Sequence, residues 1–314
     1  MAFAIEYEEF GGPEVLRYRE VPAAPAGPGE VVVAVRAIGV NPIDAKVRRA
    51  FRPSGPITSP RRPGADASGV ISAVGADVAG WQPGDEVIVA WGARTYASEV
   101  VVPVALLTPK PAGVSFEQAA ALGIPAGTAH QALVSLDVSA GETVLVHAGA
   151  GAVGQAAVQL ARRVGARVIA TASEPNHARL RELGAEPVAY RAGLAERVRA
   201  LAPDGVDASL DLVGTDEAIA VSKELTRDPA RIGTIVLGPQ AAELGIRAWS
   251  GGSPIPLTPE ELGLRADAVP LVALLLAAGR FEVEIAQVLP LAEAAEAHRL
   301  SETGHVRGKL ILVP

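Results

Sequence analysis

Cysteine is missing from this sequence altogether. Its absence excludes disulfide bonds, thiolate nucleophiles and every zinc site that is built from cysteine ligands. Aromatic residues are also scarce, at 4% of the 314 residues, whereas 49% of the residues are hydrophobic and 20% are charged. The last two fractions are typical of a folded globular protein, here one whose core is rich in Ala and Val.

Long apolar runs and clusters of positive charge are lacking as well. No run reaches the roughly 18 to 20 residues that a membrane helix needs, and residues 1–6 lack the basic segment of a signal peptide. The net charge is −7, and basic residues gather only in pairs such as Arg48-Arg49 and Arg162-Arg163. Such a charge repels nucleic acids and anionic lipids. We therefore expect a cytoplasmic protein with neither a nucleic-acid partner nor a membrane partner.

The chain is long enough for two domains, and its residue composition changes near residue 119. Before this point, short β-branched runs alternate with Gly and Pro, which predicts a small, mainly β domain. The expected strands there are Val31–Ala37, Val70–Val74, Glu86–Ala90 and Ala97–Val102.

After residue 119, Ala-rich helical stretches alternate with short apolar strands. We expect strands at Thr143–His147, Arg167–Thr171, Pro187–Tyr190, Val206–Leu212 and Ile232–Leu237. A spacing of roughly 20 to 25 residues suits strand, crossover helix and strand, so it predicts a doubly wound parallel sheet. A helix start at Thr258-Pro259-Glu260, helices around Asp267–Ala278 and Leu291–Leu300, and a strand at Lys309–Val313 complete the expected elements.

The strongest local signal is a glycine-rich turn that follows the strand Thr143–His147. It reads Gly149-Ala150-Gly151-Ala152-Val153-Gly154, a GxGxxG pattern between a predicted strand and a predicted helix. In this pattern Gly149 permits the tight turn, Gly151 lets the backbone approach a diphosphate, and Gly154 lets the helix pack on the strand. The helix N-terminus adds free N–H groups and a positive dipole end. The pattern predicts a dinucleotide-binding site, and we assign no chemistry to His147.

The residues after the next strand decide which dinucleotide is bound. NAD-binding proteins have a carboxylate at this strand end, where it accepts a hydrogen bond from the ribose 2′-OH. Here Ser173 could donate to a 2′-phosphate, and His177 and Arg179 offer further donors or positive charge, so NADPH is favoured. Glu174 stands against this assignment, because an inward-turned carboxylate would repel the phosphate.

Together with other segments, this turn resembles the zinc-independent quinone oxidoreductases of the medium-chain dehydrogenase/reductase type, the family that includes zeta-crystallin. The resemblance spans nearly the whole chain. The segments that carry it are residues 41–48 (NPIDAKVR), 63–70 (PGADASGV), Gly75, Gly84-Asp85, Thr128-Ala129, Gly151 and Gly154 of the turn, and Gly308-Lys309-Leu310.

The resemblance implies an α/β fold with a GroES-like, mainly β catalytic domain and an inserted Rossmann domain, with a cleft between them. We expect the first at residues 1–118 and 259–314, and the NADP-binding domain at residues 119–258. In the related zinc alcohol dehydrogenases, metal ligands fall where this chain has Asn41 and Ala65, so we expect no metal site. The implied activity is hydride transfer from NADPH to a quinone or to an activated C=C bond (enone).

The resemblance also implies roles for individual residues. Asn41 would face the nicotinamide, and Lys46, where many members have Tyr, could stabilise negative charge on an acceptor oxygen. Both are candidate catalytic residues, although Asn41-Pro42 is also a good turn dipeptide and Lys46 could be a solvated side chain. The full set assigned to the cofactor is Asn41, Ile43, Thr128, Gly149, Gly151, Ala152, Val153, Gly154, Ser173, His177, Arg179, Tyr190, Leu237 and Gly238.

Other interpretations remain open at this stage. An enoyl-thioester reductase shares the style of the turn, but Asn176 stands where that group has a lysine. A protein that binds NADPH without catalysis is a third possibility. We also expect a homodimer. The loop from about Trp249 to Pro256 has no readable periodicity, so the substrate cannot be named from the sequence.

Overall fold

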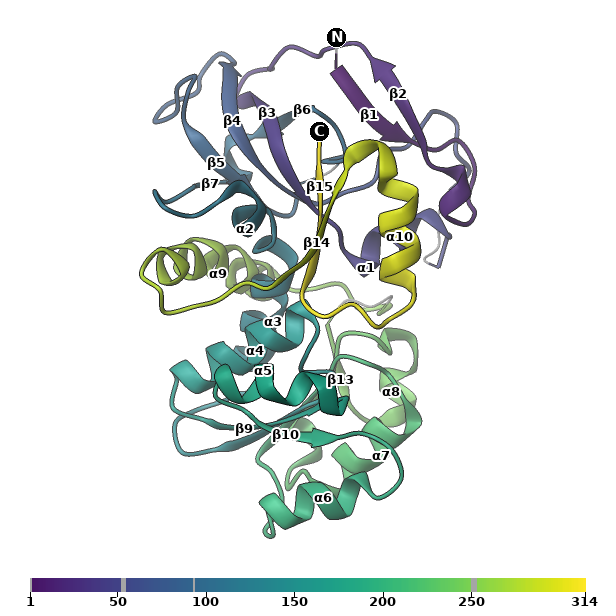
Figure 1. Cartoon of the computed structure of the whole chain (residues 1–314), viewed down its shortest axis with the longest axis vertical. Coiled ribbons are helices and arrows are strands. Elements are labelled where there is room, and N and C mark those ends of the chain that lie inside the picture. Colours follow the sequence, from purple (N-terminus) through teal and green to yellow (C-terminus); the bar gives the residue numbers. More distant parts are fainter. Residues whose placement is uncertain (1, 52–54, 93, 250–252) are drawn as a thin grey trace. The chain divides into compact units, whose positions relative to one another are not determined.

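The computed structural model describes residues 2–51, 55–92, 94–249 and 253–314. The chain divides into two compact units (Figure 1). Unit 1 consists of residues 1–124 and 269–314, and unit 2 of residues 125–268. Both ends of the chain thus belong to one unit, and the middle forms the other. The functional domain boundaries expected at residues 118 and 259 stay a prediction.

The main sheet of unit 1 has the strand order β14-β15-β3-β4-β5-β7 in the described part of the chain, and β6 also pairs with β3. All of its pairs are antiparallel except β14 with β15. Strands β1 and β2 form a separate antiparallel pair. The strand bounds are β1 Ala2–Glu6, β2 Arg17–Val21, β3 Glu30–Gly39, β4 Asp66–Val74, β5 Glu86–Val89, β6 Glu99–Pro103, β7 Leu107–Pro109, β14 Ile285–Pro290 and β15 Lys309–Val313.

The core of unit 1 comes from both ends of the sequence. β3 is buried along most of its length because it pairs with β4, β6 and β15 and carries a run of Val residues. Its core cluster joins Val33 and Ile38 of β3 to Leu310 and Leu312 of β15. The helices of this unit are α1 Pro42–Arg48, α2 Phe116–Ala120 and α10 Ala294–Glu302. C-terminal residues are therefore integral to the N-terminal β unit.

The sheet of unit 2 is parallel throughout and has the order β10-β9-β8-β11-β12-β13 in the described part of the chain. The order reverses between β8 and β11, as in a doubly wound fold. The strand bounds are β8 Thr143–Val146, β9 Arg167–Ala172, β10 Glu186–Ala189, β11 Ala208–Asp211, β12 Ile232–Thr234 and β13 Arg247–Ala248.

Helices cover both faces of this sheet (Figure 1). α4 and α5 follow β8 and β9 on one face, and α6 and α7 follow β10 and β11 on the other, as right-handed crossovers require. Leu145, Ile169 and Val198 belong to a buried cluster on the α6 and α7 side. The helix bounds are α3 Gly123–Ser135, α4 Ala152–Arg163, α5 His177–Glu182, α6 Leu194–Leu201, α7 Asp216–Leu225, α8 Ala241–Leu244 and α9 Pro259–Ala277.

The expected strands are confirmed with shifted ends, and so is the expected helix start at Pro259. The separate helix expected at residues 267–278 was wrong: these residues are the later part of that same helix, α9, which continues through Pro270 and crosses the second division between the units. Residues 250–252 of the expected loop 249–256 lie outside the described residues. No helix in the described ranges is both long and apolar enough to span a membrane.

Candidate active site

The glycine-rich turn joins β8 to α4, as the sequence predicted. Gly151 is the N-cap of α4, with φ −72° and ψ 166°, and Ala148 adopts a left-handed conformation with φ 56°. The turn is tied to the next strand, because Gly149 N donates to the Thr171 carbonyl oxygen at 2.9 Å and Ala148 N to Thr171 Oγ1 at 3.1 Å. These bonds fix the turn at the carboxyl edge of the parallel sheet, where such folds bind ligands.

The three glycines of the motif are constrained by different surroundings. A Cβ on Gly149 would lie 2.8 Å from Ala170 Cβ, and one on Gly154 would lie 2.4 Å from the Ala148 carbonyl oxygen. At Gly151 the nearest atom, that same oxygen, would be 3.7 Å away. Packing therefore requires glycine at 149 and 154. At 151 a Cβ would make only an ordinary van der Waals contact, so packing does not require glycine there.

α4 packs its small residues against the sheet. The spacing of Val153, Ala157, Leu160 and Val164 predicts one apolar face on this helix. Ala157 and Leu160 are buried and Val153 is half-buried, so the face is confirmed at Ala157 and Leu160. Val164 was wrongly placed on that face: it is the C-cap of the helix and is 49% exposed. The helix ends before its apolar periodicity does, because Gly165 follows with φ 92°.

His147 lies at the end of β8 and is buried. Its Nε2 is 3.0 Å from Ser222 Oγ on α7. Burial lowers the pKa of His147 to about 4, although Asp211 acts in the opposite direction. The ring is therefore neutral at pH 7 and packs inside unit 2.

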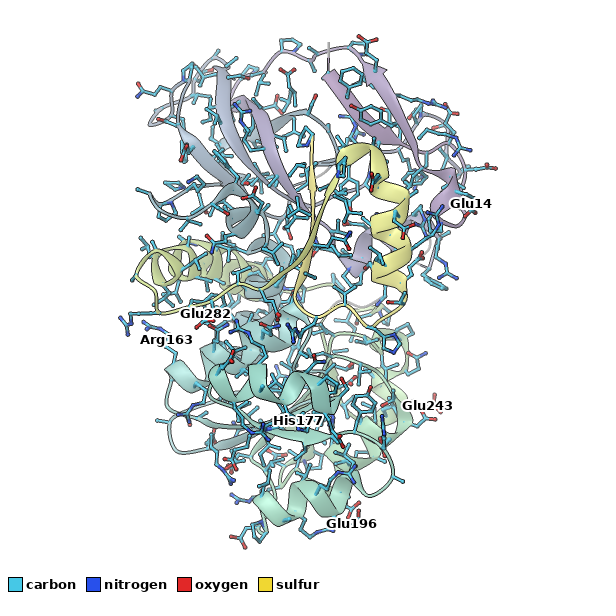
Figure 2. All side chains as sticks on the ribbon, in the orientation of Figure 1. Glu14, Arg163, His177, Glu196, Glu243 and Glu282 are labelled. Carbon is cyan, nitrogen blue, oxygen red and sulfur yellow. The ribbon has the colours of Figure 1, made fainter. Side chains whose placement is uncertain are left out.

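The residues assigned to the 2′-phosphate follow β9. Ser173 Oγ accepts a hydrogen bond from Asn176 Nδ2 at 3.1 Å, which leaves its hydroxyl hydrogen for another acceptor. His177 begins α5 and is labelled in Figure 2. Its Nε2 lies 3.2 Å from the Ala172 carbonyl oxygen, so Nε2 is the donor of that pair. Arg179 Nη1 pairs with Glu182 Oε2 at 3.3 Å.

The remaining residues assigned to the cofactor in unit 2 lie at the ends of other strands or on α3. Tyr190 follows β10 and is 43% exposed, whereas Thr128 on α3 is buried. Leu237 and Gly238 follow β12, in a loop that begins with hydrogen bonds from Val236 N and Leu237 N to Thr234 Oγ1. Since carboxyl ends of parallel strands share one edge, the structure brings the turn, Ser173, Tyr190 and Leu237 to the same edge of this sheet.

Sequence reasoning missed the pair that organises this edge, Asp211 and Thr234. Asp211 is fully buried at the end of β11, and its Oδ1 accepts from Val213 N and Gly214 N. Thr234 Oγ1 donates to Asp211 Oδ2 at 2.6 Å, which links the loops after β11 and β12. The sequence feature that could have revealed this pair is Asp211, a charged residue at the end of an otherwise apolar strand.

In unit 1 the sequence-predicted residues gather on α1. Asn41 caps this helix, and Asn41 N donates to Asp44 Oδ2 at 2.9 Å. Burial raises the pKa of Asp44 to about 7, against the effect of the Asn41 N–H. Ile43 and Lys46 are half-buried on the same helix.

Asn41 is 1% exposed, and its side chain belongs to a polar cluster that the sequence did not predict. Asn41 Nδ2 donates to Asp66 Oδ2 at 3.0 Å and to the Gly39 carbonyl oxygen at 3.2 Å. Asn41 Oδ1 accepts from Lys309 Nζ. Burial lowers the pKa of Lys309, an effect that Asp66 and Asp44 oppose. Burial likewise raises the pKa of Asp66, against the attraction of Lys309.

A second branch of the cluster runs from Asp44 to α10. Tyr96 Oη lies 3.1 Å from Asp44 Oδ2 and 3.2 Å from His298 Nε2. His298 Nδ1 lies 2.7 Å from Arg48 Nη1. Because guanidinium groups only donate, Nδ1 is the acceptor, so Nε2–H donates to Tyr96 and Tyr96 donates to Asp44. Burial and then Arg48 lower the pKa of His298 to about 3. This branch links α1 to α10, and Arg48 extends it to Glu302, because Arg48 Nη2 donates to Glu302 Oε1 at 2.7 Å.

No group of three or more His, Asp or Glu side chains that could hold a metal ion occurs in the described ranges. Asn41 and Ala65 occupy the two positions that the resemblance relates to zinc ligands.

Two family models match the chain, one in its first half and one in its second. Residues 27–133 match the alcohol dehydrogenase GroES-like domain, and residues 183–312 match the zinc-binding dehydrogenase domain. The chain is 35% identical to a quinone oxidoreductase of Pseudomonas aeruginosa, over 100% of both sequences.

Two solved structures illustrate the likeness of the folds. The chain superimposes on the Escherichia coli quinone oxidoreductase complexed with NADPH with a TM-score of 0.85 and 27% identity, over 99% of this chain and all of that one. An NAD-dependent alcohol dehydrogenase gives a TM-score of 0.84 and 32% identity, over 99% of each chain. The fold is therefore a GroES-like domain combined with an NAD(P)-binding domain.

Proposed function

Since this chain belongs to the quinone oxidoreductases of the medium-chain dehydrogenase/reductase family, we propose that it reduces a quinone or an enone with NADPH and without zinc. Membership makes it an NAD(P)H-binding oxidoreductase with a small-molecule substrate. Bound NADPH would supply the hydride, and one proton from water would complete the hydroquinone or the saturated ketone. The alternatives are an enoyl-thioester reductase and a protein that binds NADPH without turnover.

The observation that carries the proposal is the room at Gly151. The N-terminus of α4 begins there, and a diphosphate against it would receive backbone N–H groups and the positive end of the helix dipole. Glycine at this position has no packing reason in the described structure, since a Cβ would meet nothing closer than 3.7 Å. A diphosphate bound against the backbone at this position would explain why residue 151 is glycine.

The preference for NADPH is supported by the groups after β9. The Ser173 hydroxyl keeps a hydrogen to donate, and His177 follows four residues later at the start of α5. Arg179 is held by Glu182, so its charge is partly compensated. The two solved structures of similar fold differ in cofactor, since one is a complex with NADPH and the other is an NAD-dependent alcohol dehydrogenase.

The proposal that zinc is not used rests on residue chemistry. The chain has no cysteine, and an amide at Asn41 and a methyl group at Ala65 are not zinc ligands. Without a Lewis acid, charge on an acceptor oxygen has to be balanced by the protein. Lys46 on α1 is the cation we assign to this task, and Asn41 is assigned to the nicotinamide.

A homodimer is also proposed. β13 is the last strand of its sheet among the described residues, and an edge strand offers backbone groups to a second copy. Light scattering of the purified protein would test this by its mass.

The function is tested by NADPH oxidation with a panel of acceptors. Purified protein is mixed with NADPH and with quinones, enones or 2-enoyl thioesters, and the loss of nicotinamide absorbance is followed. Turnover with quinones or enones supports the proposal. Turnover confined to the thioesters would favour the enoyl-thioester reductase, and tight NADPH binding with no turnover would favour the non-catalytic protein.

A further inference from the structure

Lys309 is a buried cation at the start of β15 that no role has yet explained. Only 3% of the residue is exposed, and its ammonium group lies 3.8 Å from Asp66 Oδ2 while donating to Asn41 Oδ1. Its stem passes β3 closely, because a Cβ on Gly39 would lie 3.1 Å from Lys309 Cε. The path of this side chain is therefore narrowly defined.

The contacts of Asn41 fix the orientation of its amide without ambiguity. An ammonium group can only donate, so the atom facing Lys309 Nζ must be the amide oxygen. A carboxylate and a carbonyl oxygen accept, so the atom facing Asp66 and Gly39 must be the amide nitrogen. Exchanging oxygen and nitrogen would break all three hydrogen bonds.

These bonds also determine what Asn41 can still offer. Both hydrogens of the amide nitrogen are used inside unit 1, by Asp66 and by Gly39. The oxygen has two lone pairs, and Lys309 uses one of them. Among the residues that the structure describes, no other side chain bonds to this oxygen, so Asn41 retains the capacity to accept one hydrogen bond and none to donate.

We propose that Lys309 is a positioning residue of the reductase site, which holds the Asn41 amide so that it can act toward a ligand only as a hydrogen-bond acceptor. This inference rests on the proposed function, which assigns Asn41 to the nicotinamide. The N–H donor that the nicotinamide carries is its carboxamide, so that group is the ligand of Asn41 Oδ1. The substrate's oxygen, which develops negative charge, is not a ligand of Asn41 Oδ1, because the two oxygen atoms would repel each other. Lys46 remains the residue assigned to balance that charge.

The experiment compares two cofactors that differ in this donor. NADP⁺ carries a carboxamide, whereas its 3-acetylpyridine analogue carries a methyl ketone with no N–H group. Dissociation constants for both are measured by calorimetry, which requires no turnover. The wild-type protein should bind NADP⁺ about 3- to 10-fold more tightly, the effect of one neutral hydrogen bond. Asn41→Ala should bring this ratio close to one, and Lys309→Met should lower it, because the amide then keeps only two of its three orienting bonds.

Lys309→Met leaves the Asp66 carboxylate buried without its cation, so this variant could fail to fold. The double variant Asp66→Asn with Lys309→Met removes both charges and keeps an acceptor opposite Asn41 Nδ2. Lys309→Arg keeps the charge and the donors and should restore much of the ratio. Lys110→Met is the matched control, because Lys110 is another buried lysine of unit 1, paired with Glu86 at 2.8 Å and not with Asn41. It should leave the ratio unchanged.

A double-mutant cycle separates positioning from general loss of structure. In the Asn41→Ala background, replacing Lys309 should change the ratio no further, since Lys309 acts through Asn41. The inference would be overturned if the ratio of the two dissociation constants kept its wild-type value in the Asp66→Asn, Lys309→Met variant. A ratio of one in the wild type would overturn it as well. If the proposed function is wrong, NADPH oxidation with quinones and enones will be absent. The ratio of the two dissociation constants tests the role of Lys309 independently of that result, because it requires no turnover.

Discussion

A Cβ atom on Gly154 would lie 2.4 Å from the carbonyl oxygen of Ala148, whereas a Cβ on Gly151 would lie 3.7 Å from the same oxygen. One glycine of the turn is thus required by the fold, and the other is free of that requirement. The two positions are three residues apart on the same turn, so they form a matched pair for mutation.

The first prediction uses this pair. Gly151→Ala should leave the thermal midpoint unchanged, because φ −72° and ψ 166° suit any residue, and Gly151→Val should abolish cofactor binding by filling the diphosphate space. Gly154→Ala should instead destabilise the protein by about 1 to 3 kcal/mol, the usual result of overpacking. Thermal unfolding and calorimetric NADPH titration measure the two effects. Normal NADPH affinity in Gly151→Val would remove the turn from the proposed site.

The second prediction concerns acid stability and His147. Its pKa is about 4 in the folded protein against 6.5 for an unperturbed histidine, so only the unfolded chain binds a proton between these values. The stability that neutral His147 contributes is complete above pH 6.5 and is lost as the pH falls toward 4. The difference between the two pKa values corresponds to about 3 kcal/mol.

Urea unfolding between pH 4 and 7 measures this loss. His147→Gln, which keeps a polar group near Ser222, should show a shallower decline in unfolding free energy than the wild type. His305→Gln is the control, because His305 is exposed. Equal slopes for wild type and His147→Gln would contradict the prediction.

The third prediction concerns metal. Elemental analysis of the purified protein should find no stoichiometric zinc, and chelators should leave NADPH oxidation unchanged, since Asn41 and Ala65 are not zinc ligands. Activity that chelators remove and zinc restores would contradict the proposal that the enzyme is independent of zinc.

The sequence predicted the local features well, because each depends on neighbouring residues. The strand at 309–313, the turn at Gly149 to Gly154 and the helix start at Pro259 all follow from short patterns of apolar, glycine and proline residues. Helix ends were less certain, as the exposure of Val164 shows. Apolar periodicity continues beyond the point where Gly165 stops the helix.

The polar cluster around Asn41 could not be predicted, because its members come from distant parts of the chain. Asn41 and Lys309 are 268 positions apart, and their contact depends on the pairing of β15 with β3. The sequence showed only a lysine opening an apolar strand. Asp66 and Tyr96 likewise gain their roles from sheet pairing and burial, which no spacing of residues reveals.

The last prediction concerns the choice of cofactor. If the Ser173 hydroxyl and the donors of α5 bind the 2′-phosphate, NADPH should bind about tenfold or more tightly than NADH, since hydrogen bonds to a charged group contribute about 1.5 to 3 kcal/mol. The preference should weaken as salt rises, because exposed charges are screened. Ser173→Asp should invert it, by repelling the phosphate and offering an acceptor to a free 2′-OH. Asn176→Ala is the control: it removes the donor to Ser173 Oγ but adds no charge, so NADPH should still be preferred. Equal dissociation constants for NADPH and NADH in the wild type at low salt would contradict the assignment, and would make Glu174 the candidate ligand of the ribose.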